Sequence, residues 1–194
     1  MAPKTSKQFA EIRQKSQEKI EAAALELFAE QGFHSTSITA IAKAAGISKG
    51  LLYNYYESKE DLLHQIIDRA VGDGEEMMEA FLHAPISPAQ KVASMVEGAI
   101  QMITNDPHHW KLMTALALQG DVMESLAEKI EQKKEETIAM GAAIFEQMGF
   151  DEPRKEALFL GACLDGLMIH YISLGTDYPI EEMKSYLLKR YEKN

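Results

Sequence analysis

The chain has 194 residues, a net formal charge of −10 and 46% hydrophobic residues, which suits one or two globular domains with a substantial core. Its 12 Gly and 6 Pro are too few for a loop-rich all-β fold. A single cysteine, Cys163, excludes an intrachain disulfide and a cysteine-rich metal site, so a reducing cytoplasm fits. The polar N-terminus and the lack of 18 consecutive apolar residues predict neither a secretory signal nor a membrane span.

Charge is distributed unevenly along the chain. Residues 1–60 carry 8 Lys or Arg and 7 Asp or Glu, whereas residues 61–194 carry 12 and 23. The first third is therefore locally positive, and the acidity belongs to the remainder. Because contact with nucleic acid needs only a local basic surface, the negative net charge does not exclude a DNA partner.

The first segment combines a basic stretch with an amphipathic helix. Residues 1–15 are expected to form a flexible arm whose Lys and Arg side chains either reach DNA or remain solvated. Residues 16–31 are predicted to form a helix, because apolar residues recur there at helical spacing: Ile20, Ala23, Ala24, Leu27 and Phe28. Gly32 is expected to end it.

Residues 37–59 have the pattern of two short helices joined by a tight turn. Apolar residues at helical spacing give the first helix one buried face: Ile38, Ile41, Ala42 and Ala45. Gly46 follows where a left-handed residue ends a helix, and Ser48 is a good N-cap for the second helix. With Leu52 and Tyr56 facing inward, the pair fits either an ordinary αα-corner or a helix-turn-helix that enters the DNA major groove.

A continuous motif covers this region. Its residues are Phe33, Thr36, Ser37, Ile38, Ile41, Ala42, Ala45, Gly46, Ile47, Ser48, Gly50, Leu52, Tyr53, Tyr55, Tyr56, Lys59, Glu60 and Leu62. The motif resembles the DNA-binding domain of the TetR family of transcriptional regulators, without gaps. The one departure is Tyr56, where the family more often carries Phe, and either ring can fill the core.

The resemblance implies an all-α protein with a three-helix helix-turn-helix DNA-binding domain at 1–60 and a helical effector-binding and dimerisation domain at 61–194. The residues expected to contact DNA are Thr36, Ser37, Ser48, Lys49, Gly50, Leu51, Tyr53, Asn54, Tyr55 and Lys59. Thr36 or Ser37 would cap a helix and place its hydroxyl against a phosphate. Lys59 lies in the first turn of a helix beginning at Ser58, where a cation is unfavourable unless it faces an anion.

The rest of the chain is predicted to form further helices. The segment 154–174 is apolar on more than one face, and Gly161, Ala162 and Gly166 would let another helix approach closely. The resemblance implies that 124–148 and 154–174 pair with their copies in a homodimer. The alternative is a monomer with this helix deep in its own core. A palindromic operator read by one helix per subunit favours the dimer.

Apart from Met1, every methionine lies after residue 60, which suits an adaptable apolar pocket or ordinary core packing. Candidate pocket residues are Met102, Trp110, Met113, Phe145, Phe159 and Met168. The adjacent His108 and His109 cannot share one helical face, and no His, Asp and Glu have ligand spacing, so neither a metal nor a cofactor is expected.

The resemblance implies a ligand-responsive regulator that binds double-stranded DNA, most plainly a repressor released from a palindromic operator by a small apolar or amphipathic molecule. The alternative is an all-helical small-molecule-binding protein or enzyme that does not bind DNA. It would require a catalytic constellation. The sequence contains no Gly-rich phosphate loop, nucleophile elbow, HExxH motif or paired Glu-x-x-His.

Overall fold

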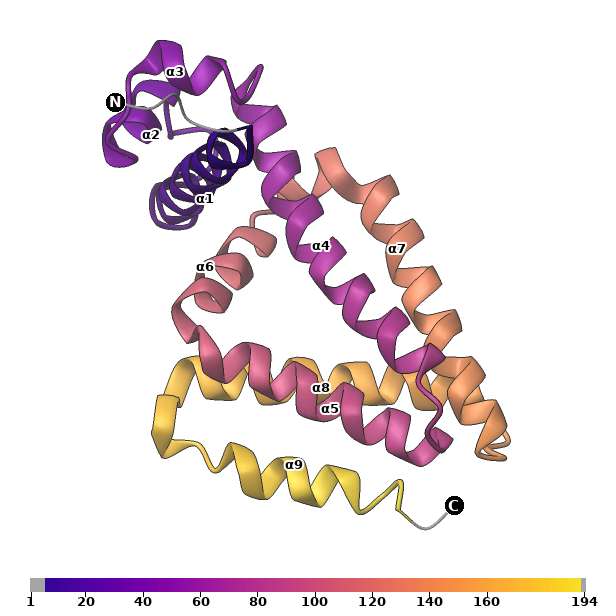
Figure 1. The fold of residues 1–194 in the computed structure, drawn as a ribbon. Coiled ribbons are helices and arrows are strands. Elements are labelled where there is room, and N and C mark those ends of the chain that lie inside the picture. The colour runs from indigo at the N-terminus through magenta and orange to yellow at the C-terminus, as the bar shows by residue number, and fades with distance from the viewer. Residues whose placement is uncertain (1–5, 193–194) are drawn as a thin grey trace. The chain divides into compact units, whose positions relative to one another are not determined.

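The computed structural model describes residues 6–192, without the side chains of residues 6, 9, 73–77, 121, 123, 125, 128 and 129. Across these residues the regular secondary structure is helical, which confirms the predicted all-α fold (Figure 1). In chain order the elements are α1 (Ser6–Gln31), α2 (Ile38–Ala44), α3 (Lys49–Tyr53), α4 (Lys59–His83), α5 (Pro88–Asn105), α6 (Pro107–Ala117), α7 (Gly120–Gln147), α8 (Pro153–Leu174), the short 3-10 helix η1 (Gly175–Asp177) and α9 (Ile180–Leu188).

The chain divides into two compact units. The first comprises Met1–Ala70 and Leu112–Leu126, and the second Val71–Lys111 and Ala127–Asn194. Helices α4, α6 and α7 therefore each begin in one unit and continue into the other. This division differs from the single boundary expected at residue 60, because helical periodicity does not reveal that Leu112–Leu126 joins the first unit.

Local signals position the helix-turn-helix in the first unit. Gly32 and Gly46 have φ values of 85° and 69°, the left-handed backbone that ends α1 and α2 at little steric cost. Ser37 and Ser48 cap α2 and α3, each hydroxyl accepting an N–H three residues on at 3.1 Å. The core beneath is formed by Ile20, Ala24, Leu25, Phe28, Phe33, Ile41, Ala42, Leu52, Tyr56, Leu62 and Leu63.

The expected flexible arm is wrong for residues 6–15. Helix α1 already begins at Ser6, and the first five residues lie outside the described part of the chain. No Gly or Pro interrupts this stretch, so the helix begins about three turns earlier than the predicted start at residue 16, ahead of the buried face that starts at Ile20. These early turns are exposed and therefore show no apolar periodicity, so the sequence pattern does not predict them.

In the second unit α5, α8 and α9 lie side by side (Figure 1). Helix α5 starts with a capping box, in which the Ser87 hydroxyl and the Gln90 side chain each accept the other's backbone N–H. The core is formed by Val92, Met95, Val96, Ile100, Ile144, Phe145, Leu160, Leu167, Ile180 and Tyr191. Helix α8 thus contributes its inward face to a core shared with α5, α7 and α9.

The opposite face of α8 is apolar but exposed. Pro153–Asp177 is long and apolar enough to cross a membrane by length and composition alone, since it contains an 18-residue window with a mean hydropathy of 1.6, yet only 17% of that window is buried. It contains no uninterrupted run of 18 apolar residues, because charged residues occupy 154–156 and Asp165 and His170 divide the remainder of the stretch. Leu158, Phe159 and Ile169 are 44%, 46% and 51% exposed. One chain alone therefore leaves a large apolar surface uncovered.

Candidate functional site

Helix α3 presents a short solvent-facing surface. The exposed residues predicted to contact DNA here are Ser48, Lys49, Gly50, Leu51, Tyr53 and Asn54. Leu52, fully buried, fixes the opposite side of the helix. The Lys49 ammonium lies over the Tyr53 ring, 5.8 Å from its centroid. An ammonium, a phenol and an amide thus project from one small surface.

Tyr55 lies between α3 and the early part of α1. Its ring is half-buried, and the Arg13 guanidinium lies over it, 5.0 Å from the centroid. Arg13 was assigned to the flexible arm, but helix α1 places it beside the helix-turn-helix instead. Arg13 is therefore a basic residue of the candidate interface, and no local pattern in the sequence indicates its position there.

Of the two candidate hydroxyls before α2, only Ser37 is exposed. Thr36 is 2% exposed, and its hydroxyl is within hydrogen-bond distance of the carbonyls of Leu27 and Gly32, at 3.1 and 2.9 Å. This geometry argues against the phosphate contact predicted for Thr36, because its only donor is already directed to backbone carbonyls. Ser37 caps α2 and remains accessible.

Lys59 is directed into the protein. Its ammonium donates to the carbonyls of Phe33, His34 and Thr36 at 2.7, 3.3 and 3.0 Å, and lies 4.3 Å from the Phe33 ring centroid. An ammonium has three donors, and all three are used. The anion expected opposite Lys59 is replaced by three carbonyl oxygens, so the phosphate role predicted for this residue is not supported by its geometry.

A polar network, buried at Tyr56 and Glu21 and exposed at Arg69, lies beneath the helix-turn-helix. The Tyr56 hydroxyl donates to the Glu21 carboxylate at 2.7 Å, and Arg69 donates to the same oxygen at 3.1 Å. Burial raises the pKa of Glu21, which the bonds from Tyr56 and Arg69 partly oppose, and burial together with the carboxylate raises the pKa of Tyr56. The network joins Glu21 on α1, Tyr56 in the segment that follows α3, and Arg69 on α4.

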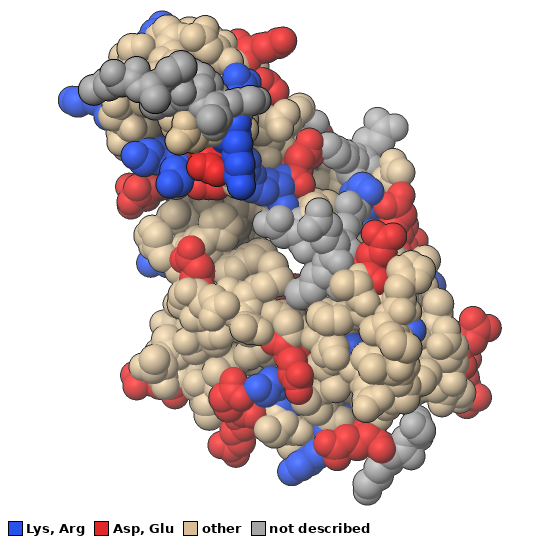
Figure 2. Space-filling view, viewed as in Figure 1, with Lys and Arg blue, Asp and Glu red and all other residues tan. Residues whose placement is uncertain are grey.

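Charges of both signs cover the first unit. Figure 2 shows Lys and Arg side chains over helices α1–α3, with acidic side chains among them. The basic residues of this region that the structure exposes include Lys7, Arg13, Lys15, Lys43 and Lys49. The candidate interface is therefore a local set of cations rather than a uniformly basic surface, which is sufficient for phosphate contact.

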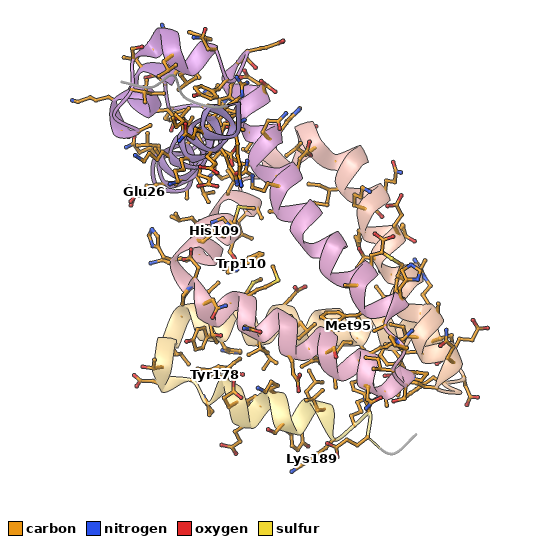
Figure 3. The ribbon with its side chains drawn as sticks, in the orientation of Figure 1. Glu26, Met95, His109, Trp110, Tyr178 and Lys189 are labelled. Atoms are coloured by element: carbon orange, nitrogen blue, oxygen red, sulfur yellow. The ribbon has the colours of Figure 1, made fainter. Side chains whose placement is uncertain are left out.

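The second unit contains a mostly apolar cavity of about 400 Å³ among α4, α5, α7 and α8. Met95 points into it from α5 (Figure 3). The other residues lining it include Met78, Ile138, Gly141, Phe145, Ala157, Leu160 and Leu164, with Lys134, Thr137 and Asp165 as its polar members. Its size and composition are those of a small-molecule site.

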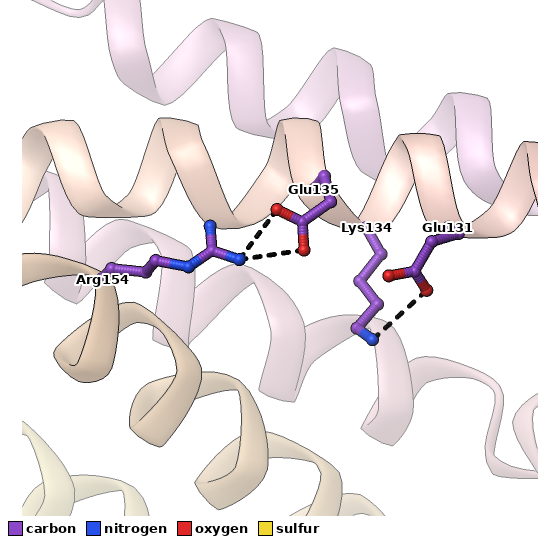
Figure 4. Close-up of polar contacts among 4 residues, drawn as sticks. All are labelled: Glu131, Lys134, Glu135 and Arg154. Atoms are coloured by element: carbon purple, nitrogen blue, oxygen red, sulfur yellow. Dashed lines mark hydrogen bonds and ion pairs between the residues drawn. The ribbon is translucent and has the colours of Figure 1, made fainter.

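The polar groups around this cavity differ in how they are paired. Lys134 forms an ion pair with Glu131 at 3.4 Å, and Arg154 donates to both carboxylate oxygens of Glu135 at 2.9 and 2.8 Å, which ties α8 to α7 (Figure 4). Partial burial raises the pKa of Asp165. Among the described side chains, no cluster of three metal-ligating groups occurs.

A second hollow, of about 660 Å³, runs between α8 and α9. Phe159, Gly166, His170, Tyr178 and Tyr186 are among its lining residues. The six predicted pocket residues thus do not form one wall. Phe145 lines the first cavity and Phe159 the second, whereas Met102, Trp110, Met113 and Met168 line neither. The Trp110 indole instead donates to the Met102 carbonyl at 3.1 Å.

The three small residues proposed for a helix crossing lie on the exposed side of α8. Gly161 and Ala162 are exposed and Gly166 is half-buried. A Cβ added at Gly161 or Gly166 would meet no other heavy atom within 4 Å. A close crossing within the chain is therefore excluded at both glycines for the residues described, and the space beside them is open.

Two family models match the chain. The model of the bacterial regulatory proteins of the tetR family matches residues 20–66, and the tetracyclin repressor-like C-terminal domain matches residues 87–189. The chain belongs to the TetR family. The first match contains the helix-turn-helix and the Tyr56–Glu21 pair. The second contains most residues that line the first cavity, together with α8 and α9, which border the second hollow.

Individual relatives agree with this assignment. The fatty acid metabolism regulator protein of Bacillus subtilis is 31% identical over 110 residues, 57% of this chain and 56% of the relative. The transcriptional regulator UidR of Escherichia coli K12 is 41% identical over 80 residues, 41% of this chain and 39% of UidR. The chain thus matches about half or less of the length of these two relatives.

The solved structures show the same fold over a longer stretch. The crystal structure of the transcriptional regulator FadR from Bacillus subtilis in complex with stearoyl-CoA has a TM-score of 0.73 and 21% identity, covering 90% of this chain and 97% of FadR. At this identity the likeness establishes the TetR fold of both halves of the chain.

Proposed function

We propose that this TetR-family chain is a homodimeric transcriptional regulator that binds a palindromic operator through α3. The observation that carries the proposal is the surface of α3, where Lys49, Tyr53 and Asn54 are exposed while Leu52 anchors the helix from below. Exposed polar side chains on a short, capped helix are what direct readout in a major groove requires.

Base and backbone contacts divide among these residues by their chemistry. Lys49 can reach guanine O6 and N7, and Asn54 can pair with adenine. Tyr53 and Ser37 carry exposed hydroxyls beside them and suit phosphate contacts, which fix register without reading sequence. Lys43 and Arg13 add exposed cations on α2 and α1 that support the same approach.

The proposed dimer uses the uncovered face of α8. Support comes from the exposed Leu158, Phe159 and Ile169 and from the open space beside Gly161 and Gly166. We propose α9 as the second helix of the interface, because its Tyr186 is 73% exposed. This differs from the expected pairing with 124–148, because the solvent-facing residues of α7 include Glu131, Glu135 and Glu136.

The proposed effector is an amphipathic molecule with a long apolar part, bound in the cavity among α4, α5, α7 and α8. Apolar walls and a few polar side chains support this class, and Lys134 supplies a cation for an anionic head group. The fold neighbour from Bacillus subtilis was solved with stearoyl-CoA. A fatty acyl-CoA is therefore the first compound to test, with release from the operator as the expected response.

Operator binding is tested by selection from random DNA with the full-length chain, followed by fluorescence anisotropy on the selected sequence and a scrambled duplex. We expect an inverted repeat with half-sites in successive major grooves. Stearoyl-CoA is then titrated into the complex, with Ile138→Trp as a cavity-filling variant and Gln132→Ala on the outside of α7 as its control. Selection of no motif would refute DNA recognition and favour a helical small-molecule-binding protein.

The titration with stearoyl-CoA tests the proposed effector site separately from operator binding. If stearoyl-CoA releases wild type and Gln132→Ala from the operator but acts weakly on Ile138→Trp, the cavity is the effector site. If it releases all three equally, another part of the chain binds it. If it releases none, the acyl-CoA class is wrong while operator recognition stands.

A further inference from the structure

The side-chain amide of Gln119 binds backbone groups on both sides of Gly32. Its Oε1 accepts the N–H of Phe33 at 3.1 Å, and its Nε2 donates to the carbonyl of Phe28 at 2.8 Å. These partners lie 86 and 91 residues away in the sequence. Because the Phe28 carbonyl also accepts the N–H of Gly32 at 3.1 Å, the amide completes the C-terminal cap of α1.

The turn bound in this way leads directly into the helix-turn-helix. Residues 32–36 connect α1 to Ser37, the N-cap of α2. Three side chains hold the turn: Thr36 from within it, Lys59 from α4, and Gln119 from the connection between α6 and α7. Since α2 positions α3 through the tight turn at Gly46, these bonds fix where the DNA-reading surface begins.

Gln119 is itself held in place by its surroundings. Its N–H donates to the Leu116 carbonyl at 3.1 Å, and its carbonyl accepts the Val122 N–H at 3.1 Å. Leu116 and Val122 are 0% and 1% exposed, so the connection is anchored in the core of the first unit. Helix α7 begins at the next residue, Gly120, and its later residues Lys134, Ile138 and Phe145 line the cavity.

We propose that Gln119 is a positioning residue for operator recognition, which ties the turn before α2 to the start of α7. The inference rests on the proposed function and extends it to a residue outside the DNA-binding sequence motif. Losing the amide leaves the Phe33 N–H and one Phe28 lone pair without their partner and frees the turn. Specific binding should suffer most, because attraction to phosphates does not need an accurately placed α3.

The test compares full-length Gln119→Ala with Gln132→Ala, a matched loss of a glutamine amide whose one bond to a described residue is an exposed one to Glu136. Anisotropy is measured on the selected operator and on scrambled DNA, at a temperature where circular dichroism shows both variants folded. With two hydrogen bonds lost, we expect Gln119→Ala to bind the operator about tenfold more weakly and scrambled DNA less than about twofold more weakly. Hydrogen exchange should also become faster in the peptide covering residues 28–36.

The ratio of the two affinities separates positioning from a general loss of stability, which would lower the binding of both DNAs by the same factor. Gln119→Met keeps the length of the side chain but loses both hydrogen bonds, so it should give the same operator-to-scrambled ratio as Gln119→Ala. It also decides the question if Gln119→Ala does not fold. An operator-to-scrambled ratio equal to that of Gln132→Ala would overturn the proposal. If the wild type selects no motif, the proposed function itself fails.

Discussion

The hydroxyl of Tyr56 donates a 2.7 Å hydrogen bond to the carboxylate of Glu21, and the two residues are only 2% and 8% exposed. TetR-family sequences more often carry Phe at the position of Tyr56, and the partner on α1 explains the difference here. A buried carboxylate needs a donor, and Tyr56 supplies it from the segment that follows α3. The pair therefore couples the helix-turn-helix to α1 through a polar bond inside an apolar core.

Tyr56→Phe should lower the free energy of unfolding at pH 7 by about 1 kcal/mol or somewhat more, because it removes a hydrogen bond to a buried charged group. Urea denaturation followed by circular dichroism measures this change. Tyr53→Phe serves as the control, since the Tyr53 ring is 47% exposed. Equal stability of the two variants would show that the Glu21 contact contributes nothing.

Alkaline pH should destabilise the wild type more than Tyr56→Phe. The pKa of Tyr56 is raised in the folded state, so this phenol contributes stability that is fully present below the ordinary tyrosine pKa of about 10 and is lost as the pH rises through its folded value. Burial also raises the pKa of Tyr191 to about 12. Absorbance titration of the folded protein should therefore show that Tyr56 and Tyr191 deprotonate above the ordinary tyrosine pKa, and Tyr56→Phe should remove one of these two transitions.

Lys59→Ala and Lys49→Ala should affect different properties. Lys59→Ala removes three bonds to the turn at 33–36 and should lower the melting temperature, with little change in the salt dependence of DNA binding. Lys49→Ala should leave the melting temperature unchanged. If Lys49 also contacts a phosphate, its loss flattens the salt slope by about one unit in each subunit. A flatter slope for Lys59→Ala would restore its predicted phosphate role.

Replacing Lys49 or Asn54 by Ala should relax base preference at a symmetric pair of operator positions. The expected loss of discrimination is about 1–3 kcal/mol for each bidentate contact removed. Selection from random DNA by wild type and each variant reveals the change. Lys43→Ala, which removes an exposed cation from α2 rather than α3, should keep the wild-type motif. Identical motifs for all four proteins would place base readout elsewhere.

Gly161→Leu and Gly166→Leu should separate the proposed dimer without unfolding its subunits. A Cβ at either site meets no other heavy atom of the chain within 4 Å, and replacing the glycine favours the helix by about 0.8–1.0 kcal/mol, so we expect the subunit to accommodate the new side chain. At an interface it forces the helices apart. Sedimentation velocity and circular dichroism on the same samples measure both effects, with Gly72→Leu on α4 as an equally open control. A dimer that persists in the two α8 variants would exclude this face.

The sequence was sufficient wherever structure depends on near neighbours. Ser37 and Ser48 cap helices three residues ahead, and Gly32 and Gly46 end helices by their own backbone conformation. Such signals were read correctly because cause and effect lie within one turn of each other. The exposed surface of α3 followed from the same short-range pattern.

Sequence and structure differ where partners are distant in the sequence. The sequence predicts a phosphate contact for Lys59, because helical periodicity does not reveal its three carbonyl partners, which lie 23 to 26 residues earlier. No motif or periodicity in the sequence indicates that Gln119 contacts the turn after α1. The pocket residues were chosen by type, but Phe145 and Phe159 line different hollows, and only the packing of α7, α8 and α9 could have separated them.

The exposed apolar face of α8 has a genetic consequence. If two chains join through Leu158, Phe159 and Ile169, a subunit with a defective α3 still pairs with an intact one and spoils its operator binding. Substitutions such as Asn54→Ala should then be dominant when wild-type and mutant genes are expressed together. Substitutions that block α8, such as Gly166→Leu, should be recessive, because the mutant chain never enters a mixed dimer.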